Sequence, residues 1–252
     1  MKKNFLITVY ITNRNYGNFI KKAIDSVLNQ SYSNLEIVII DDASTDNSIN
    51  ILKNYKNIKN IKIIFNKSKK GLVKSSIIAI KASRGRYILR LDADDYLNTH
   101  ALKYMFNKIK NKPDVALVFP DFFNVCKNSN FISRFRYTHK KKYNFLDMPA
   151  HGACSLMNKK IFFKIGGYNK LFDRQDGFYI WLLILLNKFK IIHCQKPLFY
   201  YRKHDNNLSK NTKKILKTRL KILQFFLKNK ENHISPLKKL KQKTILKLKN
   251  IK

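Results

Sequence analysis

Three aspartates crowd into one short segment, YILRLDADDYL (residues 87–97), as Asp92, Asp94 and Asp95. The chain has 15 acidic residues against 52 lysines and arginines, so this cluster stands out. Carboxylates this close repel one another unless a positive group lies among them. Mg²⁺ and Mn²⁺ bind one or two protein carboxylates and complete their shell with substrate phosphates. We therefore expect the three residues to hold Mn²⁺ or Mg²⁺; the alternative is a turn in which aspartates make local hydrogen bonds.

A second acidic segment, IVIIDDASTDNS, also follows an apolar run. Asp41 could accept hydrogen bonds from a nucleotide base and from ribose hydroxyls. The helix expected to open just after it would turn backbone amides toward a nucleotide phosphate. The alternative is that the neighbouring polar residues only cap this helix: Asp42, Ser44 and Asp46, with Ser44 or Thr45 as the N-cap. Capping leaves Asp41 without a structural role.

The elements that would position these residues alternate regularly over the first 100 residues. Apolar runs predict strands at 5–11, 35–41, 61–65 and 86–91, and helical spacing predicts helices at 17–30, 44–55 and 71–83. Apolar strands alternating with helices indicate an α/β fold, a mostly parallel central sheet with helices on both faces. Ligands bind such sheets at the carboxyl ends of the strands. Three polar segments fall there and predict one shared crevice: Thr12 to Asn15, Asp41-Asp42 and Asp92 to Asp95.

The second half of the chain is less regular. We expect strand segments at 115–125, a short helix ending at Gly166-Gly167, a buried helix at 176–189, and strand and loop at 190–194 and 197–204. After Asp205 the composition changes, because residues 206–252 carry one acid, Glu231, and fifteen lysines or arginines. This tail is expected to form two basic helices, 212–229 and 236–251, separated by a polar break that ends at Pro236.

Composition limits the class of protein. A length of 252 residues suits one large domain, and no apolar run is long enough to cross a bilayer. The three cysteines, Cys126, Cys154 and Cys194, form no CxxC pair. That pattern fits a reducing cytoplasm and argues against a disulfide framework or a zinc site. The net charge of +37 favours an anionic partner, whether membrane, nucleic acid or nucleotide phosphate.

Two long segments together resemble the family 2 glycosyltransferases of the GT-A (Rossmann-like) fold. They are VYITNRNYGNFIKKAIDSVLNQSYSNLEIVIIDDASTDNS and KKGLVKSSIIAIKASRGRYILRLDADDYL, within about residues 6–98. The resemblance resumes at KIGGYNKLFDRQDGFYIWL and PLFYYRKHDNNLS, and ends near 209. It implies inverting, metal-dependent transfer of a sugar from a nucleotide-diphospho-sugar, expected to be UDP-linked. The implied acceptor is a hydroxyl of a glycan or lipid-linked glycan in surface polysaccharide synthesis.

The resemblance also assigns residues. Thr12 and Asn15 would lie in the first nucleotide loop, and Asp41, with Asp42 beside it, would bind the nucleotide-sugar through its base. Asp92 would contact ribose and, with Asp94, hold the metal on the diphosphate, and Asp95 is a further candidate ligand. The resemblance divides 1–209 into a nucleotide-binding half, 1–98, and an acceptor-binding half, 99–209. Residues 210–252 would be a basic helical extension.

The second half should supply a base, because an inverting transfer needs a carboxylate to take the proton of the attacking acceptor hydroxyl. The family places it where a helix opens, which here is Asp176 in FDRQDGFYIWL. The alternative role of Asp176 is a helix N-cap, and the two roles are compatible. The segment YRKHDNNLS also matches the family, so Arg202 and His204 would meet the diphosphate from the lid side. Without that match, His204 would be read as a surface residue.

Three positions depart from the family pattern. Thr12 replaces a usual proline, Ser75-Ser76-Ile77 replaces Ala-Arg-Asn, and Gln175 stands where glutamate is common. The second change removes an arginine that often contacts the diphosphate or base, and Lys74 or Arg90 is the candidate replacement. These departures leave the preferred nucleotide open and remove none of the expected carboxylates.

Three alternative functions share some features with this sequence. A sugar-1-phosphate nucleotidyltransferase shares a related sheet, but it normally has a glycine-rich loop after the first strand, where ITNRNYG has one glycine. A nucleic-acid-binding protein would interleave lysines with exposed aromatics, whereas most aromatics here lie in apolar runs, so no nucleic acid is expected. A third possibility is an inactive relative that only binds.

The basic tail has two interpretations. Its apolar residues share one helical face, so 210–252 could contact an anionic membrane peripherally or pack on the domain with its lysines in solvent. The corresponding location is the cytoplasm, with contact at the inner face of the plasma membrane.

Overall fold

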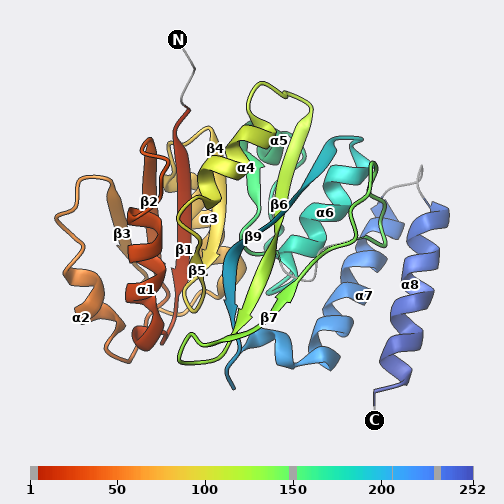
Figure 1. Ribbon diagram of the computed structural model, residues 1–252. Coiled ribbons are helices and arrows are strands. Elements are labelled where there is room, and N and C mark those ends of the chain that lie inside the picture. The colour runs from red at the N-terminus through yellow and green to blue at the C-terminus, as the bar shows by residue number, and fades with distance from the viewer. Residues whose placement is uncertain (1–4, 148–151, 206, 230–233, 252) are drawn as a thin grey trace.

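The computed structural model describes residues 5–147, 152–205, 207–229 and 234–251. It forms one curled sheet with helices packed on both faces, as the sequence predicts (Figure 1). The first half is parallel throughout and has the order β3-β2-β1-β4. Its strands are β1 (Ile7–Asn13), β2 (Leu35–Asp41), β3 (Ile61–Phe65) and β4 (Tyr87–Asp92). The helices between them are α1 (Gly17–Leu28), α2 (Ser48–Lys53) and α3 (Leu72–Ala82).

The register of these strands decides where the polar residues meet. β1 lies between β2 and β4, with Asn13 opposite Asp41 and Thr12 opposite Asp92. Because all three strands run in the same direction, their carboxyl ends reach the same edge of the sheet. The cavity found at this edge is lined by Thr12 of β1 and Asp92 of β4, whereas Asp41 and Asp42 at the end of β2 do not line it.

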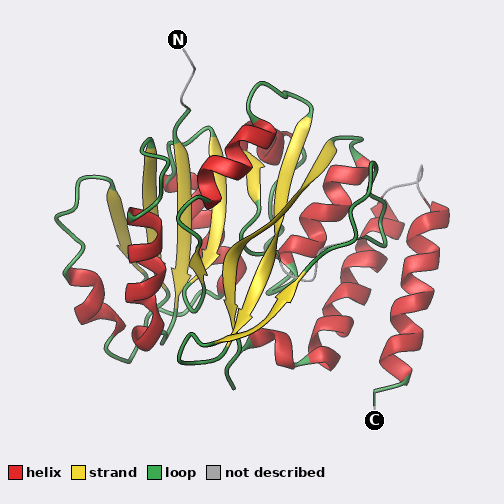
Figure 2. Ribbon diagram, in the orientation of Figure 1, coloured by secondary structure: helices red, strands yellow, loops and turns green. Residues whose placement is uncertain are grey.

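The second half extends the sheet in mixed directions (Figure 2). Its strands are β5 (Tyr96–Leu97), β6 (Val115–Val125), β7 (Phe131–Phe135), β8 (Leu156–Asn158) and β9 (Lys190–Arg202). β8 joins β4 to β6 by antiparallel pairing on both sides, and β6 runs parallel to β9. The helices are α4 (Ala101–Ile109), α5 (Lys159–Lys164) and α6 (Asp176–Leu186). Sequence patterns did not predict β5, β7 or β8.

Alternation along the strands separates two cores. Ile7, Val9 and Ile11 of β1 face the cluster that contains α1 and α4, while Tyr10 faces the cluster that contains α3, α5 and α6. Since successive side chains of a strand point to opposite faces, apolar residues at every position bury both faces. This explains why the strands read as solid apolar runs. None of the helices in the described ranges is long and apolar enough to span a membrane.

The basic tail packs on the domain. α7 (Thr212–Asn229) and α8 (Ile234–Lys249) lie side by side at one end of the molecule (Figure 1). Phe226 of α7 and Leu237 of α8 are buried in the same core cluster as Trp181 of α6. The apolar side of the tail is thus used inside the protein, which is the packing interpretation.

Two predicted boundaries were wrong. α2 begins at Ser48 and not at 44, because Ser44 and Thr45 bond to other loops. α8 begins at Ile234, so Pro236 lies in its first turn and does not end a break. A proline fits there, since the first amides of a helix have no partner within the helix. The residues between α7 and α8 lie outside the described part of the chain.

Candidate active site

A cavity of about 190 Å³ opens at the carboxyl edge of the sheet. Of the predicted site residues, Thr12, Asp92, Asp94 and Asp176 line it. The wall is completed by residues that surround these four, among them Tyr16, Arg90, Arg174, Gln175, Tyr201, Asn207, Leu208, Ile215 and Arg219. The structure therefore brings Asp92 and Asp94 of the predicted metal cluster and the predicted base, Asp176, into one space.

The end of β2 is tied down by hydrogen bonds. Asp41 is buried and its Oδ1 accepts hydrogen bonds from Asn13 Nδ2 at 2.8 Å and Ser44 Oγ at 2.6 Å. Its Oδ2 accepts one from the backbone N–H of Ser44 at 3.0 Å. Asn15 Oδ1 accepts a hydrogen bond from the Thr45 N–H at 2.7 Å, which joins the first loop to the second. Neither Ser44 nor Thr45 caps α2, so that prediction was wrong.

Asp42 anchors a third loop. Its Oδ1 accepts hydrogen bonds from Asn66 Nδ2 and the Lys70 N–H, and its Oδ2 accepts one from the Gly71 N–H, each at 2.8 Å. Burial alone would raise the pKa of Asp42, but the hydrogen bonds from Lys70, Asn66 and Gly71 outweigh burial and lower it. The carboxylate is 4% exposed and does not line the cavity. It organises the segment that leads into α3.

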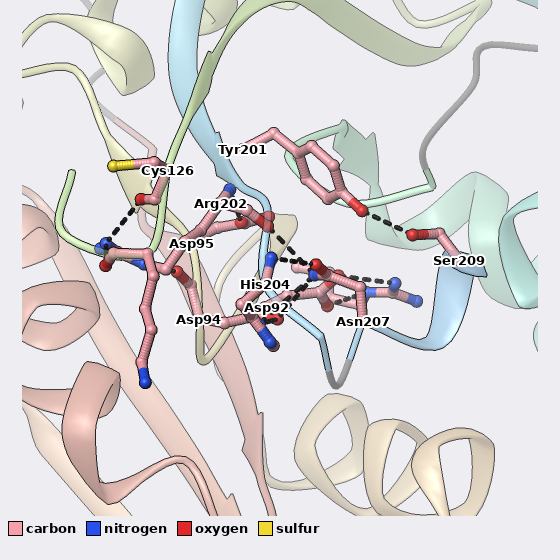
Figure 3. Close-up of polar contacts among 11 residues, drawn as sticks. Asp92, Asp94, Asp95, Cys126, Tyr201, Arg202, His204, Asn207 and Ser209 are labelled. Carbon is pink, nitrogen blue, oxygen red and sulfur yellow. Dashed lines mark hydrogen bonds and ion pairs between the residues drawn. The ribbon is translucent and has the colours of Figure 1, made fainter. Parts of the chain in front are cut away.

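The three aspartates after β4 form the one cluster in the described residues that could hold a metal ion. One carboxylate oxygen from each of Asp92, Asp94 and Asp95 lies within 4.8 Å of the others. Figure 3 shows them meeting the segment around His204 and Asn207. Asp94 Oδ2 pairs with His204 Nε2 at 2.9 Å and accepts a hydrogen bond from Asn207 Nδ2 at 3.4 Å.

Negative charge in this cluster is only partly compensated. Asp95 Oδ1 accepts a hydrogen bond from the Arg202 N–H at 2.8 Å, but its buried Oδ2 has no hydrogen-bond partner among the described residues. Burial, Asp94 and Asp92 together raise the pKa of Asp95 well above its usual range. Burial also raises the pKa of Asp92, although Arg90 opposes this effect. An orphan carboxylate oxygen beside two further carboxylates fits a hard divalent cation.

Arg90 links the aspartate cluster to the candidate base. Its Nε donates to Asp92 Oδ1 at 2.8 Å and its Nη2 to Asp92 Oδ2 at 3.2 Å, while Nη1 forms an ion pair with Asp176 Oδ2. Burial would lower the pKa of Arg90, but Asp176 and Asp92 raise it, so the guanidinium stays charged. An arginine inside the apolar strand YILRL was the sequence signal for this role. By contrast, Lys74 is exposed and does not line the cavity.

Arg202 and His204 lie behind the aspartates. Arg202 is 2% exposed, and its guanidinium donates to the carbonyl of Asp94 at 2.7 Å and to the carbonyl of Lys127 at 2.6 Å. It thus fastens the aspartate loop to the loop after β6. The His204 ring stacks on Phe19 with 5.2 Å between ring centroids. Neither residue lines the cavity, and their partners are protein groups (Figure 3).

In the segment before α6, the sequence predicted the position of Asp176 but not the conformation or the contact of Gln175. Gln175 precedes α6 in a left-handed conformation with φ 62° and places Asp176 in the first turn. Its Oε1 accepts a hydrogen bond from Arg219 Nε of α7 at 2.6 Å. α7 therefore reaches the cavity wall. The contact joins positions 44 apart in the chain, and no local pattern signals it.

The comparisons with known proteins agree with this geometry. The sequence model described as glycosyl transferase family 2 matches residues 8–166, more than half of the chain, so the chain belongs to this family. Escherichia coli WfgD, a UDP-Glc:alpha-D-GlcNAc-diphosphoundecaprenol beta-1,3-glucosyltransferase, is 25% identical over 229 residues. That match covers 90% of this chain and 88% of WfgD. The chondroitin synthase of E. coli is 33% identical over 134 residues. That match includes 53% of this chain and 19% of the longer chondroitin synthase.

Solved structures show the same fold. S. aureus TarS in complex with UDP-GlcNAc has a TM-score of 0.77 at 17% identity, with 95% of this chain and 71% of TarS covered. The mannosyltransferase PcManGT of Pyrobaculum calidifontis, in complex with GDP-Man and Mn²⁺, has a TM-score of 0.73 at 13% identity, with 99% and 71% covered. At these identities the likeness establishes the GT-A fold.

Proposed function

We propose that this protein is an inverting, metal-dependent glycosyltransferase that moves a sugar from a UDP-sugar to a hydroxyl of a lipid-linked glycan in surface polysaccharide synthesis. The observation that carries the proposal is the shared cavity, in which the aspartate cluster and Asp176 are joined through Arg90. Membership of the family supports transfer of a sugar. The printed activity of WfgD, which uses UDP-Glc, supports the UDP-linked donor.

The metal belongs at Asp92, Asp94 and Asp95. Mn²⁺ or Mg²⁺ held there would neutralise the donor's diphosphate and favour departure of the nucleotide. The orphan Oδ2 of Asp95 supports a cation at this place, and the Mn²⁺ in PcManGT shows that a protein of this fold binds one. Asp92, which lines the cavity, would also contact the ribose.

The nucleotide lies against the first two loops in this proposal. Thr12 lines the cavity, and Asn15 holds the loop to Thr45, so both would position the base and ribose. Asp41 would bind the base after exchanging one of its protein partners. Asp42, whose carboxylate is fully used by protein donors, acts by supporting the loop before α3.

Asp176 is the proposed general base. It lines the cavity at the start of α6, on a segment held by Gln175 and Arg219. Its carboxylate would take the proton of the acceptor hydroxyl as that oxygen attacks the anomeric carbon and the nucleotide leaves. Arg90 fixes Asp176 relative to Asp92, so donor and base keep one mutual geometry.

Arg202 and His204 act through the metal cluster in this scheme. We expected both to meet the diphosphate, and the geometry favours a supporting role, because His204 pairs with Asp94 and Arg202 holds the Asp94 and Asp95 backbone. His204 also packs on Tyr16, which lines the cavity. Movement of this segment on donor binding would bring both residues closer to the phosphates.

We propose the same domain division as the sequence suggested, with one addition. Residues 1–98 bind the nucleotide and 99–209 the acceptor, while 210–252 extend the acceptor half by closing one wall of the cavity. Peripheral contact with an anionic inner leaflet, at the cytoplasmic side, would be electrostatic. Its support is the exposed lysines on α7 and α8, since apolar residues of these helices such as Leu223, Phe226 and Leu237 are buried in the core.

The test is nucleotide binding with and without metal. Thermal shifts of the full chain are measured with UDP, GDP, dTDP and CMP, each in Mn²⁺ or in EDTA. UDP should raise Tm in Mn²⁺ only, because ligand binding to the folded state stabilises it. Asp94→Ala should lose this shift, whereas Asp114→Ala, a half-exposed aspartate outside the cavity, should keep it. An equal shift in EDTA or in Asp94→Ala contradicts the metal assignment. No response to any nucleotide favours an inactive relative that only binds.

A further inference from the structure

Two arginines to which the proposed transfer gives no contact with a substrate reach the cavity beside Asp176. Arg174 comes from the segment before α6, two residues ahead of the base, and Arg219 comes from α7. Both line the same space as Asp176 and Gln175. The direct contact between Arg219 and Gln175 places both guanidinium-bearing residues at the entrance to α6.

Arg174 is mostly buried yet poorly satisfied. Its side chain is 15% exposed, and Nε has no hydrogen-bond partner among the described residues. The nearest carboxylate to it is Asp173, whose Oδ2 lies 3.9 Å from Nε and whose side chain is 66% exposed. An exposed contact at that distance is weak. A buried N–H without an acceptor is energetically costly, and a ligand in the cavity could supply that acceptor.

Arg219 is held in place by neighbouring groups. Its Nε donates to Gln175 Oε1 at 2.6 Å, and its guanidinium carbon lies 5.0 Å from the centre of the Phe178 ring. The glutamine contact is a hydrogen bond and the ring contact is a cation–π interaction, and together they fix the guanidinium at the cavity wall. Burial lowers the pKa of Arg219, and an anion bound beside it would oppose that effect.

The charges of the cavity wall divide into two zones. Arg90 is paired with Asp92 and Asp176, and Asp94 with His204, which leaves the metal zone negative. The zone next to Asp176 holds Arg174 and Arg219 and is positive. Ile215 lies one turn before Arg219 on α7, and both it and Leu208, which is 56% exposed, line the cavity. The cavity therefore offers guanidinium and apolar groups together, as a ligand with a phosphate and a hydrocarbon chain requires.

We infer that Arg174 and Arg219 form a subsite for the phosphate groups of a lipid-diphosphate-linked acceptor, with Leu208 and Ile215 against the first part of the lipid. This inference rests on the proposed function. The donor diphosphate belongs with the aspartates, and the acceptor hydroxyl belongs at Asp176. A glycan whose reacting sugar is joined directly to diphosphate carries its negative charge close to that hydroxyl, and the two arginines line the same cavity as Asp176. Guanidinium groups suit such phosphates because they donate two parallel hydrogen bonds.

The test is direct binding of farnesyl diphosphate to the full chain in EDTA, measured by titration calorimetry. EDTA excludes any phosphate bound through a metal at the aspartates. Arg174→Gln and Arg219→Gln should each weaken binding about 10-fold, because each removes a charge-assisted hydrogen bond. Lys217→Gln removes the same charge from an exposed position of α7 and should change binding less than about 2-fold. Arg219→Lys, which keeps the charge, should recover part of the loss.

Two further ligands separate the sources of phosphate. Farnesol should not bind measurably, and inorganic pyrophosphate should bind more weakly than farnesyl diphosphate in the wild type. UDP affinity in Mn²⁺ should stay within about 2-fold of wild type in the arginine variants.

The inference is overturned if both arginine variants, still folded by circular dichroism, bind farnesyl diphosphate as the wild type does. It is also overturned if the variants lose UDP affinity in the same proportion, because the arginines then serve the donor. Failure of UDP to bind wild-type protein in Mn²⁺ would instead refute the proposed function, independently of the EDTA titration.

Discussion

Two acidic clusters occupy the same edge of one sheet, and they are satisfied in opposite ways. After β2, Asp41 and Asp42 accept hydrogen bonds from side chains and backbone amides of neighbouring loops. After β4, Asp95 keeps a buried oxygen without a partner among the described residues, and its pKa is raised by burial and by its acidic neighbours. The pKa of Asp42 is lowered, because hydrogen bonds outweigh burial there.

The difference teaches how to separate carboxylates that the protein itself satisfies from carboxylates that need an added cation. Both clusters follow apolar strands, so residue type and position are the same. What differs is whether the protein itself supplies the donors. A saturated carboxylate fixes loops, whereas an unsaturated cluster of like charges is stable only with a cation or proton added. The following predictions test this contrast, beginning with the largest expected effect.

The first change acts on Asp176, which Arg90 joins to the unsaturated cluster. Asp176→Asn removes the proposed base and keeps the side-chain volume, so turnover should fall by roughly 10²–10⁴-fold. UDP release from UDP-sugar, in the presence of acceptor, measures turnover, and calorimetry measures UDP affinity in Mn²⁺. UDP affinity should remain near wild type. A turnover within a few-fold of wild type would remove Asp176 from the mechanism.

The second change acts on the saturated side. Asn66, Lys70 and Gly71 now donate hydrogen bonds to the two carboxylate oxygens of Asp42. Asp42→Asn replaces one of these oxygens by an NH₂ group, which cannot accept a hydrogen bond, so at least one donor loses its acceptor. Leaving a buried donor unsatisfied should lower the free energy of unfolding by about 1–3 kcal/mol. Urea unfolding of metal-free protein measures the loss. Asp205→Asn, at a fully exposed side chain, is the control and should leave the midpoint unchanged.

The third change should raise the stability of the metal-free protein, by less than Asp42→Asn lowers it. Asp95→Asn removes buried negative charge, so metal-free protein should unfold at a higher Tm than wild type. The gain should depend on pH. The folded pKa of Asp95 is raised, so the penalty in wild type is complete above that pKa and disappears as pH falls through it. Melting curves from neutral to acidic pH in EDTA should therefore converge; a constant difference would argue against a charged Asp95. With Mn²⁺ present the order of the two proteins should reverse.

The smallest effect concerns backbone strain in the loop that follows the saturated cluster. Ala43, directly after Asp42, has φ 57°, a left-handed conformation that a β-carbon disfavours. Ala43→Gly should raise the free energy of unfolding by about 0.5–1 kcal/mol, since relief of that strain exceeds the added chain entropy. Urea unfolding again measures it. An unchanged or lower stability would mean that the loop relaxes around alanine.

The first half of the fold and the position of the crevice followed from the sequence. Solid apolar runs such as LEIVII and YILRL fix buried parallel strands, and polar residues at their carboxyl ends must then meet. The short strands β5, β7 and β8 were missed because two or three residues, or an exposed edge strand such as FISRF, carry no clear period.

Within the site, the residues were easier to predict than their contacts. Asp92 and Asp94 were found from residue type and position, and Asp176 was found from the family resemblance; all three line the cavity. The bridge through Arg90 and the Arg219–Gln175 contact join residues 86 and 44 positions apart, and such pairs depend on packing that no local pattern encodes. The saturation of Asp42 likewise depends on Asn66 and the turn at Gly71, which sequence reasoning did not connect to it.

The contribution of α7 to the cavity wall has a consequence for how such enzymes diversify. The family pattern spans residues 8–166, and α7 lies well beyond it. Under the proposed function, a lineage that replaces its last helices would alter acceptor binding and keep the donor-binding loops. Grafting the terminal helices of one relative onto another would then change the acceptor used, and inhibitors directed at this wall would distinguish relatives whose nucleotide pockets are alike.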